Sequence, residues 1–213
     1  MMKKILALLV IVVLAMATGC SKKQETTEEN IQTNKVEETQ KETVPEKSLE
    51  ELCANKMFFT IEMQNGDVMK GEVYPDLAPE TVKNFVALCD ANFYEGLIFH
   101  RVIPGFMIQG GGFDVDMNQK EAQSIKGEFD SNGFTNPLEH DRGVLSMART
   151  QVKDSASSQF FIMHEDAPHL DGQYAAFGKV TSGMDVVDSI AETKVDFSDR
   201  PLYDFVIKTI KMA

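Results

Sequence analysis

The amino-acid sequence predicts a mainly β fold, an antiparallel barrel covered by two α-helices. Three features lead to this prediction. Short apolar runs of strand length recur between residues 57 and 211, separated by turn-forming residues. Asn65-Gly66, between the first two runs, is a strong signal for a two-residue hairpin. Two stretches far apart in the chain carry apolar residues at the spacing of an amphipathic helix.

The expected strands follow these apolar runs. The first two flank the hairpin, at 57–63 and 68–74. The others are expected at 97–103, 106–109, 143–148, 159–163, 175–180 and 202–211. Residues 110–133 are rich in Gly, Asp, Asn and Gln, and they predict a long loop with one brief strand.

The two helices have recognisable starts or faces. The first is expected to begin at Pro79, because proline fits the first turn of a helix, with Ala78 or Asp76 as its cap. Its apolar face comprises Val82, Phe85, Val86 and Cys89. The second helix is expected at 182–191, and its apolar face comprises Met184, Val187 and Ile190.

The N-terminus is typical of a targeting segment. Lys3 and Lys4 precede an apolar run at 5–17, which is too short to span a bilayer comfortably. The run ends in Ala17-Thr18-Gly19-Cys20, which resembles a bacterial lipoprotein processing site. The resemblance implies a signal peptide at 1–19 and a lipidated Cys20 that anchors the protein to a membrane. An ordinary signal peptide or an uncleaved anchor is the alternative.

Residues 20–56 are expected to link this anchor to a folded domain at 57–213. From 21 to 48 the chain is rich in Glu, Thr, Gln and Lys and has no apolar periodicity, which predicts a disordered tether. Such a coil of about 28 residues spans roughly 25–30 Å. Residues 49–56 could form a short helical lead-in.

Charge and cysteine content narrow the possible functions. The net charge is −12, and residues 57–213 hold 24 acidic side chains against 13 basic ones. Because nucleic-acid binding needs clustered cations, we expect no nucleic-acid partner. Cys89 lies in the helical pattern and is expected to be a buried thiol, while Cys53 is expected to be exposed. A Cys53–Cys89 disulfide stays open as an alternative.

Three ordered motifs carry a family resemblance. They are FHRVIPGFMIQGG at 99–111, GVLSMAR at 143–149 followed by SASSQFFI at 155–162, and LDGQYAAFGKV at 170–180. Together they resemble the cyclophilin family of peptidyl-prolyl isomerases, over residues 57–213. The resemblance implies a closed eight-stranded antiparallel β-barrel with an α-helix over each end. It also implies an enzyme that needs no cofactor and no metal.

Arg101 is the principal candidate for the chemistry. The bond before proline isomerises slowly because C–N resonance imposes a barrier of about 20 kcal/mol. A donor aimed at the prolyl nitrogen favours the twisted amide over the planar one. The guanidinium of Arg101 is always charged and presents several N–H groups in a fixed fork. The alternative is a strand arginine paired with a surface carboxylate.

The resemblance supplies the other site residues. Gln109 and Phe106 join Arg101 as catalytic residues, Gln109 orienting the substrate backbone and Gln159 holding Arg101. Phe106, Met107, Phe161 and Leu170 line a pocket for the proline ring, although barrel core is the ordinary fate of such residues. Ala148 and Arg149 border the groove. His100 matches a family position beside the arginine and is interpreted as supporting rather than catalytic. Either glutamine could instead satisfy a barrel carbonyl.

Two positions depart from many eukaryotic relatives. His169 stands where those relatives carry tryptophan, which argues against tight cyclosporin binding. Tyr174 stands at the pocket edge in place of histidine, as bacterial members often have it. Both are expected to contact substrate. His164 and His169 are five residues apart with Pro168 between them, which is unlike a helical zinc site.

The sequence therefore predicts a monomeric, membrane-anchored isomerase outside the cytoplasm, acting on proline-containing segments of exported proteins. One alternative is a chaperone or adaptor module that binds such segments with little turnover. A solute-binding lipoprotein is a more distant one, and the motifs argue against it.

Overall fold

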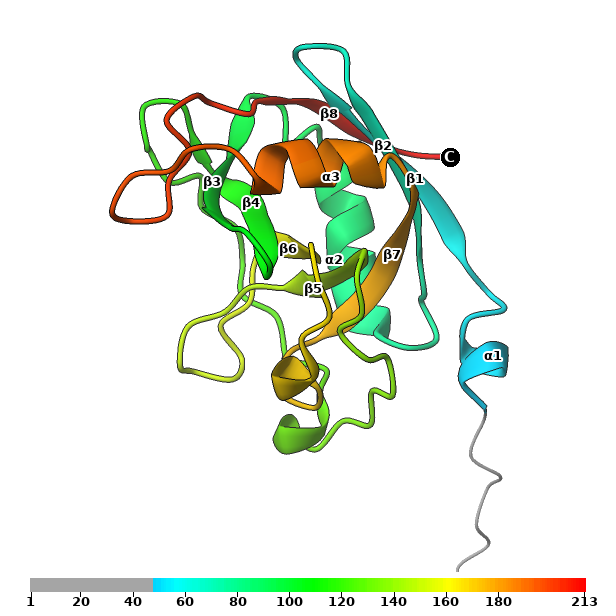
Figure 1. Ribbon diagram of the computed structural model, residues 1–213. Coiled ribbons are helices and arrows are strands. Elements are labelled where there is room, and N and C mark those ends of the chain that lie inside the picture. The colour runs from blue at the N-terminus through cyan, green and yellow to red at the C-terminus, as the bar shows by residue number, and fades with distance from the viewer. Residues whose placement is uncertain (1–47) are drawn as a thin grey trace, which may run out of the picture. The chain divides into compact units, whose positions relative to one another are not determined.

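The computed structural model describes residues 48–213, which form an eight-stranded antiparallel sheet rolled into a barrel (Figure 1). The strands are β1 Met57–Met63, β2 Val68–Val73, β3 Leu97–Ile103, β4 Met107–Asp114, β5 Val144–Met147, β6 Phe160–Met163, β7 Ala176–Ser182 and β8 Ile207–Met212. Their order in the sheet is β3-β4-β6-β5-β7-β2-β1-β8. The predicted mainly β fold is confirmed.

The barrel closes between β3 and β8, the two ends of the sheet. Ile98 and Val206 form an antiparallel bridge there. The N–H of Phe99 donates to the carbonyl of Phe205 at 3.1 Å. This short seam leaves little unpaired sheet edge, which lowers the risk of pairing with another chain.

The structure corrects the prediction for the start of the 110–133 segment. Residues 110–114 belong to β4, which is longer than the 106–109 run expected. The glycines there allow neighbouring rings to approach closely: a Cβ atom on Gly110 would lie 2.9 Å from the Phe99 ring, and one on Gly111 would lie 3.0 Å from the Phe160 ring. The glycines that make this segment look like a loop are therefore needed for close packing within a strand.

The structure contains three α-helices in its described part: α1 Leu49–Leu52, α2 Pro79–Asp90 and α3 Met184–Ala191. Two 3₁₀ turns, η1 Asp130–Asn132 and η2 Pro168–Leu170, lie in the loops. In Figure 1, α3 lies in front of the upper strands and α2 runs behind β7. The second helix begins two residues later than expected, because Ser182 still pairs with Lys70 in the sheet.

Ala78, one of the two residues expected to cap α2, occupies the N-cap position, but a distant carboxylate supplies the capping hydrogen bonds. Ala78 is the N-cap residue and makes no side-chain cap. Instead, the buried Glu128 side chain accepts hydrogen bonds from the N–H groups of Glu80 at 3.0 Å and Thr81 at 2.8 Å. Two donors of the first helical turn are thereby satisfied, and a negative charge lies at the positive end of the helix dipole.

The barrel core is built around Phe85 of α2. Its ring lies 5.3–6.0 Å from four aromatic neighbours, centroid to centroid. These neighbours are Phe59, Tyr94, Phe160 and Phe177. Because they come from β1, the loop after α2, β6 and β7, this one side chain ties the helix to strands far apart in the sequence.

Both cysteines of the described part are free thiols, so the alternative Cys53–Cys89 disulfide is not formed. Cys89 is buried as predicted, and burial raises the pKa of its thiol to about 12. Cys53 is half-buried rather than exposed, and burial, with the negative charge of Glu72, raises its pKa.

Several predictions concern residues outside 48–213: the signal peptide, the lipidated Cys20 and the tether up to residue 47. Within the described residues, α1 Leu49–Leu52 agrees with the expected helical lead-in, and its start is closed by a capping box between Ser48 and Glu51. None of the described helices has the length and apolar character needed to cross a membrane.

We predict that Glu128→Gln destabilises the domain by about 1–3 kcal/mol, because an amide can accept only one of the two helix N–H bonds and leaves a buried donor facing the other. Urea unfolding measures this loss. Glu80→Gln, an exposed change in the same helical turn, should alter the unfolding free energy by less than about 0.5 kcal/mol. Equal effects of the two substitutions would contradict the capping role.

Candidate active site

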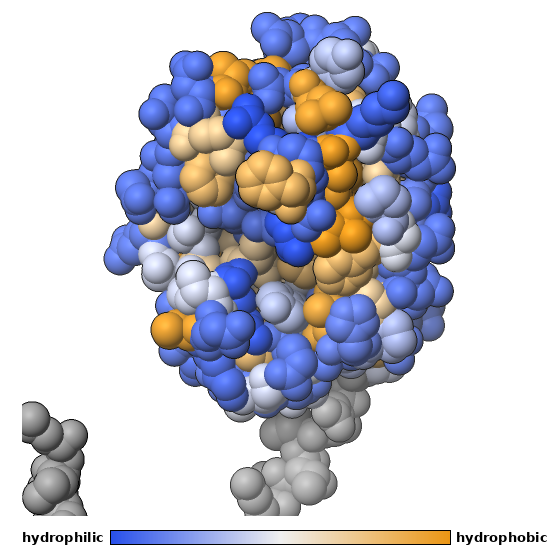
Figure 2. Space-filling model, turned by 60° about the vertical axis from the view of Figure 1, so that its left-hand side comes forward, coloured by the Kyte–Doolittle hydropathy of each residue, from blue (hydrophilic) through white to orange (hydrophobic). Residues whose placement is uncertain are grey.

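A small pocket of about 140 Å³ lies on the outer face of β3, β4, β5 and β6. Its lining residues are Arg101, Phe106, Met107, Gln109, Ala148, Arg149, Phe161, Leu170 and Tyr174. Figure 2 turns the side of β3 and β4 toward the viewer, and this face is hollowed near its centre with an apolar floor. Nine of the eleven site residues predicted from the sequence thus surround one cavity.

A cross-strand row brings the main candidates together. Arg101 on β3 pairs with Gln109 on β4, and Gln109 pairs in turn with Phe161 on β6. Next to this row, Met107 pairs with Met163. Directly opposed residues share a face of the sheet, so a cation, an amide and an aromatic ring stand side by side.

A β-bulge at His100 puts Arg101 on this face. Phe99 pairs with Gly110 and Arg101 with Gln109, so β3 has one residue more than β4 over this step. Phe99 is buried in the barrel core, whereas the Arg101 side chain is 43% exposed. In a regular strand, residues two apart point to the same side, so the extra residue is what separates them.

The floor of the pocket is a second apolar cluster, separate from the barrel core. Its buried members are Met107, Val144, Phe161, Met163, Ala167, Leu170 and Ala176. Phe161 stands between two rings, stacked on His140 at 6.1 Å and edge-on to Tyr174 at 5.9 Å. An apolar cavity with one fixed aromatic wall suits a small, compact, apolar ring.

A buried polar network fixes the wall behind Phe161. Asp171 accepts the backbone N–H of His140 at 2.8 Å and lies 2.9 Å from its Nδ1, while Nε2 lies 3.0 Å from the Ser146 hydroxyl. Burial lowers the pKa of His140 even though Asp171 opposes this shift, so the ring is neutral at pH 7. Nδ1–H therefore donates to Asp171, and Nε2 accepts from Ser146.

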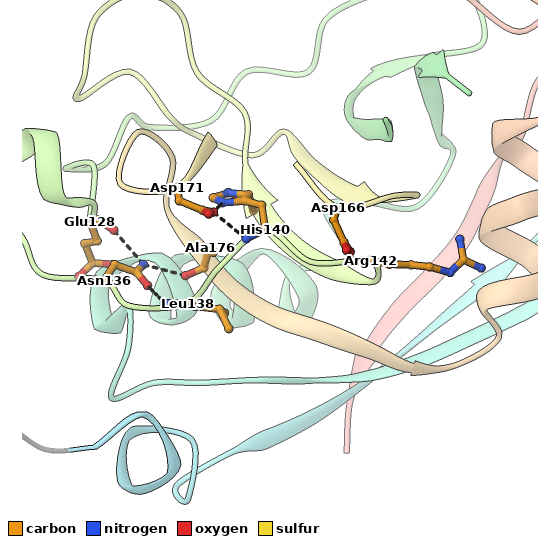
Figure 3. A network of polar contacts seen from close by, with 9 residues as sticks. Glu128, Asn136, Leu138, His140, Arg142, Asp166, Asp171 and Ala176 are labelled. Carbon is orange, nitrogen blue, oxygen red and sulfur yellow. Dashed lines mark hydrogen bonds and ion pairs between the residues drawn. The ribbon is translucent and has the colours of Figure 1, made fainter. Parts of the chain in front are cut away.

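These residue types resemble a hydrolytic triad, but their burial excludes that chemistry. Ser146 and His140 are 0% and 1% exposed, so no substrate can reach the hydroxyl. The network instead joins the chain around η2 to β5. Figure 3 shows the contacts between His140 and Asp171 beside a second group of contacts, in which Asn136 donates to the carbonyls of Glu128 and Ala176.

Arg101 has an acidic surface partner, as the alternative interpretation expected, although the sequence did not indicate that this partner is Asp199. Its Nε lies 3.5 Å from Oδ2 of Asp199, and the Asp199 carbonyl accepts the N–H of Val102 at 2.8 Å. Asp199 has a left-handed backbone, with φ of 62°. Because the contact depends on how the loop before β8 folds, no local pattern in the sequence signals it.

The neighbouring His100 carries no charge at neutral pH. Burial lowers its pKa to about 4, and the positive charges of Arg101 and Arg200 act in the same direction. Its ring packs against Phe113 at 4.7 Å. Arg101 is therefore not accompanied by a second cation from the bulge.

The two glutamines interact with each other. Nε2 of Gln109 donates to Oε1 of Gln159 at 3.0 Å. The expected contact between Gln159 and Arg101 is not among the hydrogen bonds of residues 48–213, and Gln159 lines the adjoining hollow rather than the pocket. Gln159 is therefore the hydrogen-bond partner of Gln109, while Asp199 forms an ion pair with the arginine.

The remaining predicted residues form the rim. The Arg149 guanidinium donates to the carbonyl of Gln173 at 2.9 Å and lies 4.5 Å from the Tyr174 ring centre, so it is engaged in holding the loop. Ala148 lines the pocket beside it. His169 lies outside the lining, exposed and stacked on Phe106 at 5.6 Å.

Comparison with known proteins agrees with this geometry. Residues 58–212 match the family described as "Cyclophilin type peptidyl-prolyl cis-trans isomerase/CLD". The chain therefore belongs to the cyclophilin family, and it is an enzyme, a peptidyl-prolyl cis-trans isomerase.

Bacterial relatives are similar over most of the domain. Peptidyl-prolyl cis-trans isomerase A of Dickeya dadantii is 49% identical over 145 residues, which cover 63% of this chain and 74% of the relative. Peptidyl-prolyl cis-trans isomerase B of Escherichia coli is 41% identical over 166 residues, covering 72% and 98%.

Solved structures show the same fold. A cyclophilin-type isomerase of Cryptosporidium parvum superposes with a TM-score of 0.64 at 30% identity, covering 74% of this chain and 98% of that one. A cyclophilin of Hirschia baltica gives 0.60 at 23% identity, covering 78% and 81%, and supports the fold alone.

We predict that Gly112→Ala weakens the site without weakening the fold. A Cβ atom there would lie 2.4 Å from Cγ of Gln159, so the flexible glutamine must move and Gln109 loses its partner. The loss of about one hydrogen bond should lower kcat/KM by about five- to tenfold, with the unfolding free energy changed by less than about 1 kcal/mol.

A double-mutant cycle checks this cause. In a Gln159→Ala background, Gly112→Ala should produce no further loss of kcat/KM. The same loss in both backgrounds would show that Gly112 acts by another route.

Proposed function

We propose that Arg101 carries the isomerase chemistry by donating a hydrogen bond to the prolyl nitrogen of the bound substrate. In the planar amide the nitrogen electron pair is delocalised into the carbonyl, and in the twisted amide it becomes available as an acceptor. A donor placed there stabilises the twisted state more than either planar state, which is the condition for catalysis. The observation that supports the proposal is the position of Arg101 at the mouth of the apolar pocket.

The required effect is moderate. Each 1.36 kcal/mol of differential stabilisation gives a tenfold acceleration, so about 7 kcal/mol would give 10⁵-fold. A charged donor in a partly dry groove can supply a large part of this amount, because one preorganised donor is worth about 3–4 kcal/mol in comparable sites. The bulge sets the position of Arg101 on the outer face, and its guanidinium pairs with the half-exposed Asp199.

The neighbouring residues complete the proposal. The apolar floor of Met107, Phe161 and Leu170 takes the proline ring, with Phe106 at its edge. Gln109, held by Gln159, keeps donor or acceptor capacity for the substrate backbone. A structure of the Cryptosporidium parvum relative determined in the presence of the dipeptide Ala-Pro is consistent with a short proline-containing ligand.

We predict that Arg101→Ala lowers kcat/KM for an Ala-Pro peptide by at least about 100-fold, the loss usual for one key donor. The kcat/KM of Arg101→Lys should lie between those of wild type and Arg101→Ala, because lysine keeps the charge but lacks the planar fork of N–H donors. The measurement is the rate of cis-to-trans relaxation of the Ala-Pro peptide in the presence of each protein. Unchanged relaxation in Arg101→Ala would overturn the mechanism. Binding of proline peptides without acceleration by the wild type would favour the chaperone or adaptor alternative.

We infer that the enzyme works outside the cytoplasm, as a monomer tethered to a membrane by lipid on Cys20, and acts on proline-containing segments of exported proteins. Support comes from the sequence at 1–20: a basic start, a short apolar run and small residues before the cysteine. Two acyl chains provide stable anchoring that one chain does not. The intervening polar residues then hold the domain away from the bilayer.

We predict that the chain expressed in a bacterium incorporates labelled palmitate and sediments with membranes, and that Cys20→Ser abolishes the labelling. Cys53→Ser is the matched control and should leave both properties intact, because that thiol belongs to the folded domain. Equal labelling of wild type and Cys20→Ser, or labelling of neither, would rule out the anchor.

A further inference from the structure

Two loops beside Arg101 expose large apolar side chains. On the loop before β8, Phe197 is fully exposed, Tyr203 is 76% exposed and Leu202 is 57% exposed. On the turn after β4, Val115 and Met117 are 43% and 37% exposed. We call these five residues the loop patch.

The loop patch is held in a fixed shape. Arg200 bridges the two loops, with Nη2 donating to the carbonyl of Val115 at 3.1 Å. The base of the longer loop is closed by a bridge between Val195 and Pro201 and by the Asp196 N–H, which donates to the Arg200 carbonyl at 2.8 Å. These contacts order the loops before any ligand binds, which lowers the entropy lost on binding.

The loop that carries Phe197, Leu202 and Tyr203 lies beside the proline pocket, because Asp199 of this loop contacts Arg101. Asp199, two residues after Phe197, contacts Arg101 through its carboxylate and Val102 through its carbonyl. A polypeptide that places its proline in the pocket and leaves past Arg101 meets this loop next. Figure 2 shows apolar side chains gathered on this face, next to the hollow.

The five side chains of the loop patch do not contribute to the apolar clusters that stabilise the fold. None of the five belongs to the barrel core or to the cluster under the pocket. Exposed apolar surface of this kind marks interaction sites on soluble domains. By contrast Phe58, a half-exposed ring on β1, has a cation partner within the domain, Lys56 at 5.9 Å from its centre.

The geometry points to the loop patch as a secondary binding site for apolar residues of the substrate polypeptide that lie outside the proline dipeptide. The inference rests on the proposed function, since it assigns a second contact of the same substrate. Such a secondary site makes the enzyme prefer unfolded chains, in which apolar residues near proline are accessible, over short peptides that fill only the proline pocket.

The charges around the loop patch argue against a membrane as its occupant. Carboxylates of Asp116, Asp196, Asp199 and Asp204 lie on the same two loops, and Asp114 is the last residue of β4 before the shorter loop. They repel anionic lipid headgroups. The same charges favour substrate segments in which apolar residues are flanked by Lys or Arg.

The test compares Phe197→Ser/Tyr203→Ser with wild type in the full-length protein, with Phe58→Ser as the matched control. Two substrates are needed: an Ala-Pro tetrapeptide, and a permanently unfolded, proline-containing protein labelled for fluorescence anisotropy. We expect kcat/KM for the tetrapeptide to stay within twofold in all three proteins. The Kd for the unfolded protein should rise about tenfold in the double variant and stay unchanged in the control.

The two readouts separate the two proposals. Unchanged Kd in the double variant overturns the loop patch as a substrate site, whatever happens with the tetrapeptide. Absence of tetrapeptide turnover by the wild type counts against the proposed mechanism, while the anisotropy still decides on the loop patch. A double variant that loses only self-association, or only binding to anionic vesicles, also overturns the inference and assigns those occupants instead.

Discussion

The register of β3 against β4 and β6 is the constraint on which the site depends. It sets Arg101, Gln109 and Phe161 in one row on the outer face, while Ile108 and Ile162 of the same strands fill the core. Side chains alternate along a strand, so a slip of one residue would bury the arginine and expose the core. The His100 bulge sets the register between β3 and β4, and Phe160 of β6 packs edge-on against Phe85 in the core.

Much of the fold could be predicted from local sequence. The Asn65-Gly66 hairpin, the Pro79 helix start and most strand positions follow from turn chemistry and apolar spacing. The errors share one cause, which is contact between distant segments. The composition of 110–133 predicts a long loop with one brief strand, yet the glycines at its start continue β4, where Gly110 and Gly111 let Phe99 and Phe160 pack closely. Glu128 caps a helix that begins 49 residues before it, and no window of sequence can show this.

The candidate site likewise contains residues that could be predicted from the sequence and residues that could not. Residues within the three motifs could be placed in one pocket because the family resemblance carries their arrangement. Their partners could not be predicted: Asp199 for Arg101, Gln109 for Gln159, and His140 with Ser146 behind Phe161. Each of these contacts joins a motif residue to another strand or loop. Sequence reasoning thus identified the residues that line the pocket and missed several of the residues that contact them.

The free thiols of the domain have a consequence for where the chain can mature. The described domain has no covalent cross-link, so its barrel needs no oxidant to reach the native state. A thiol whose pKa is raised to about 12, as for Cys89, is protonated at neutral pH and reacts slowly in disulfide exchange. The Cys89 thiol is therefore protected both by burial and by its protonation. Folding of the barrel does not depend on forming a disulfide between Cys53 and Cys89.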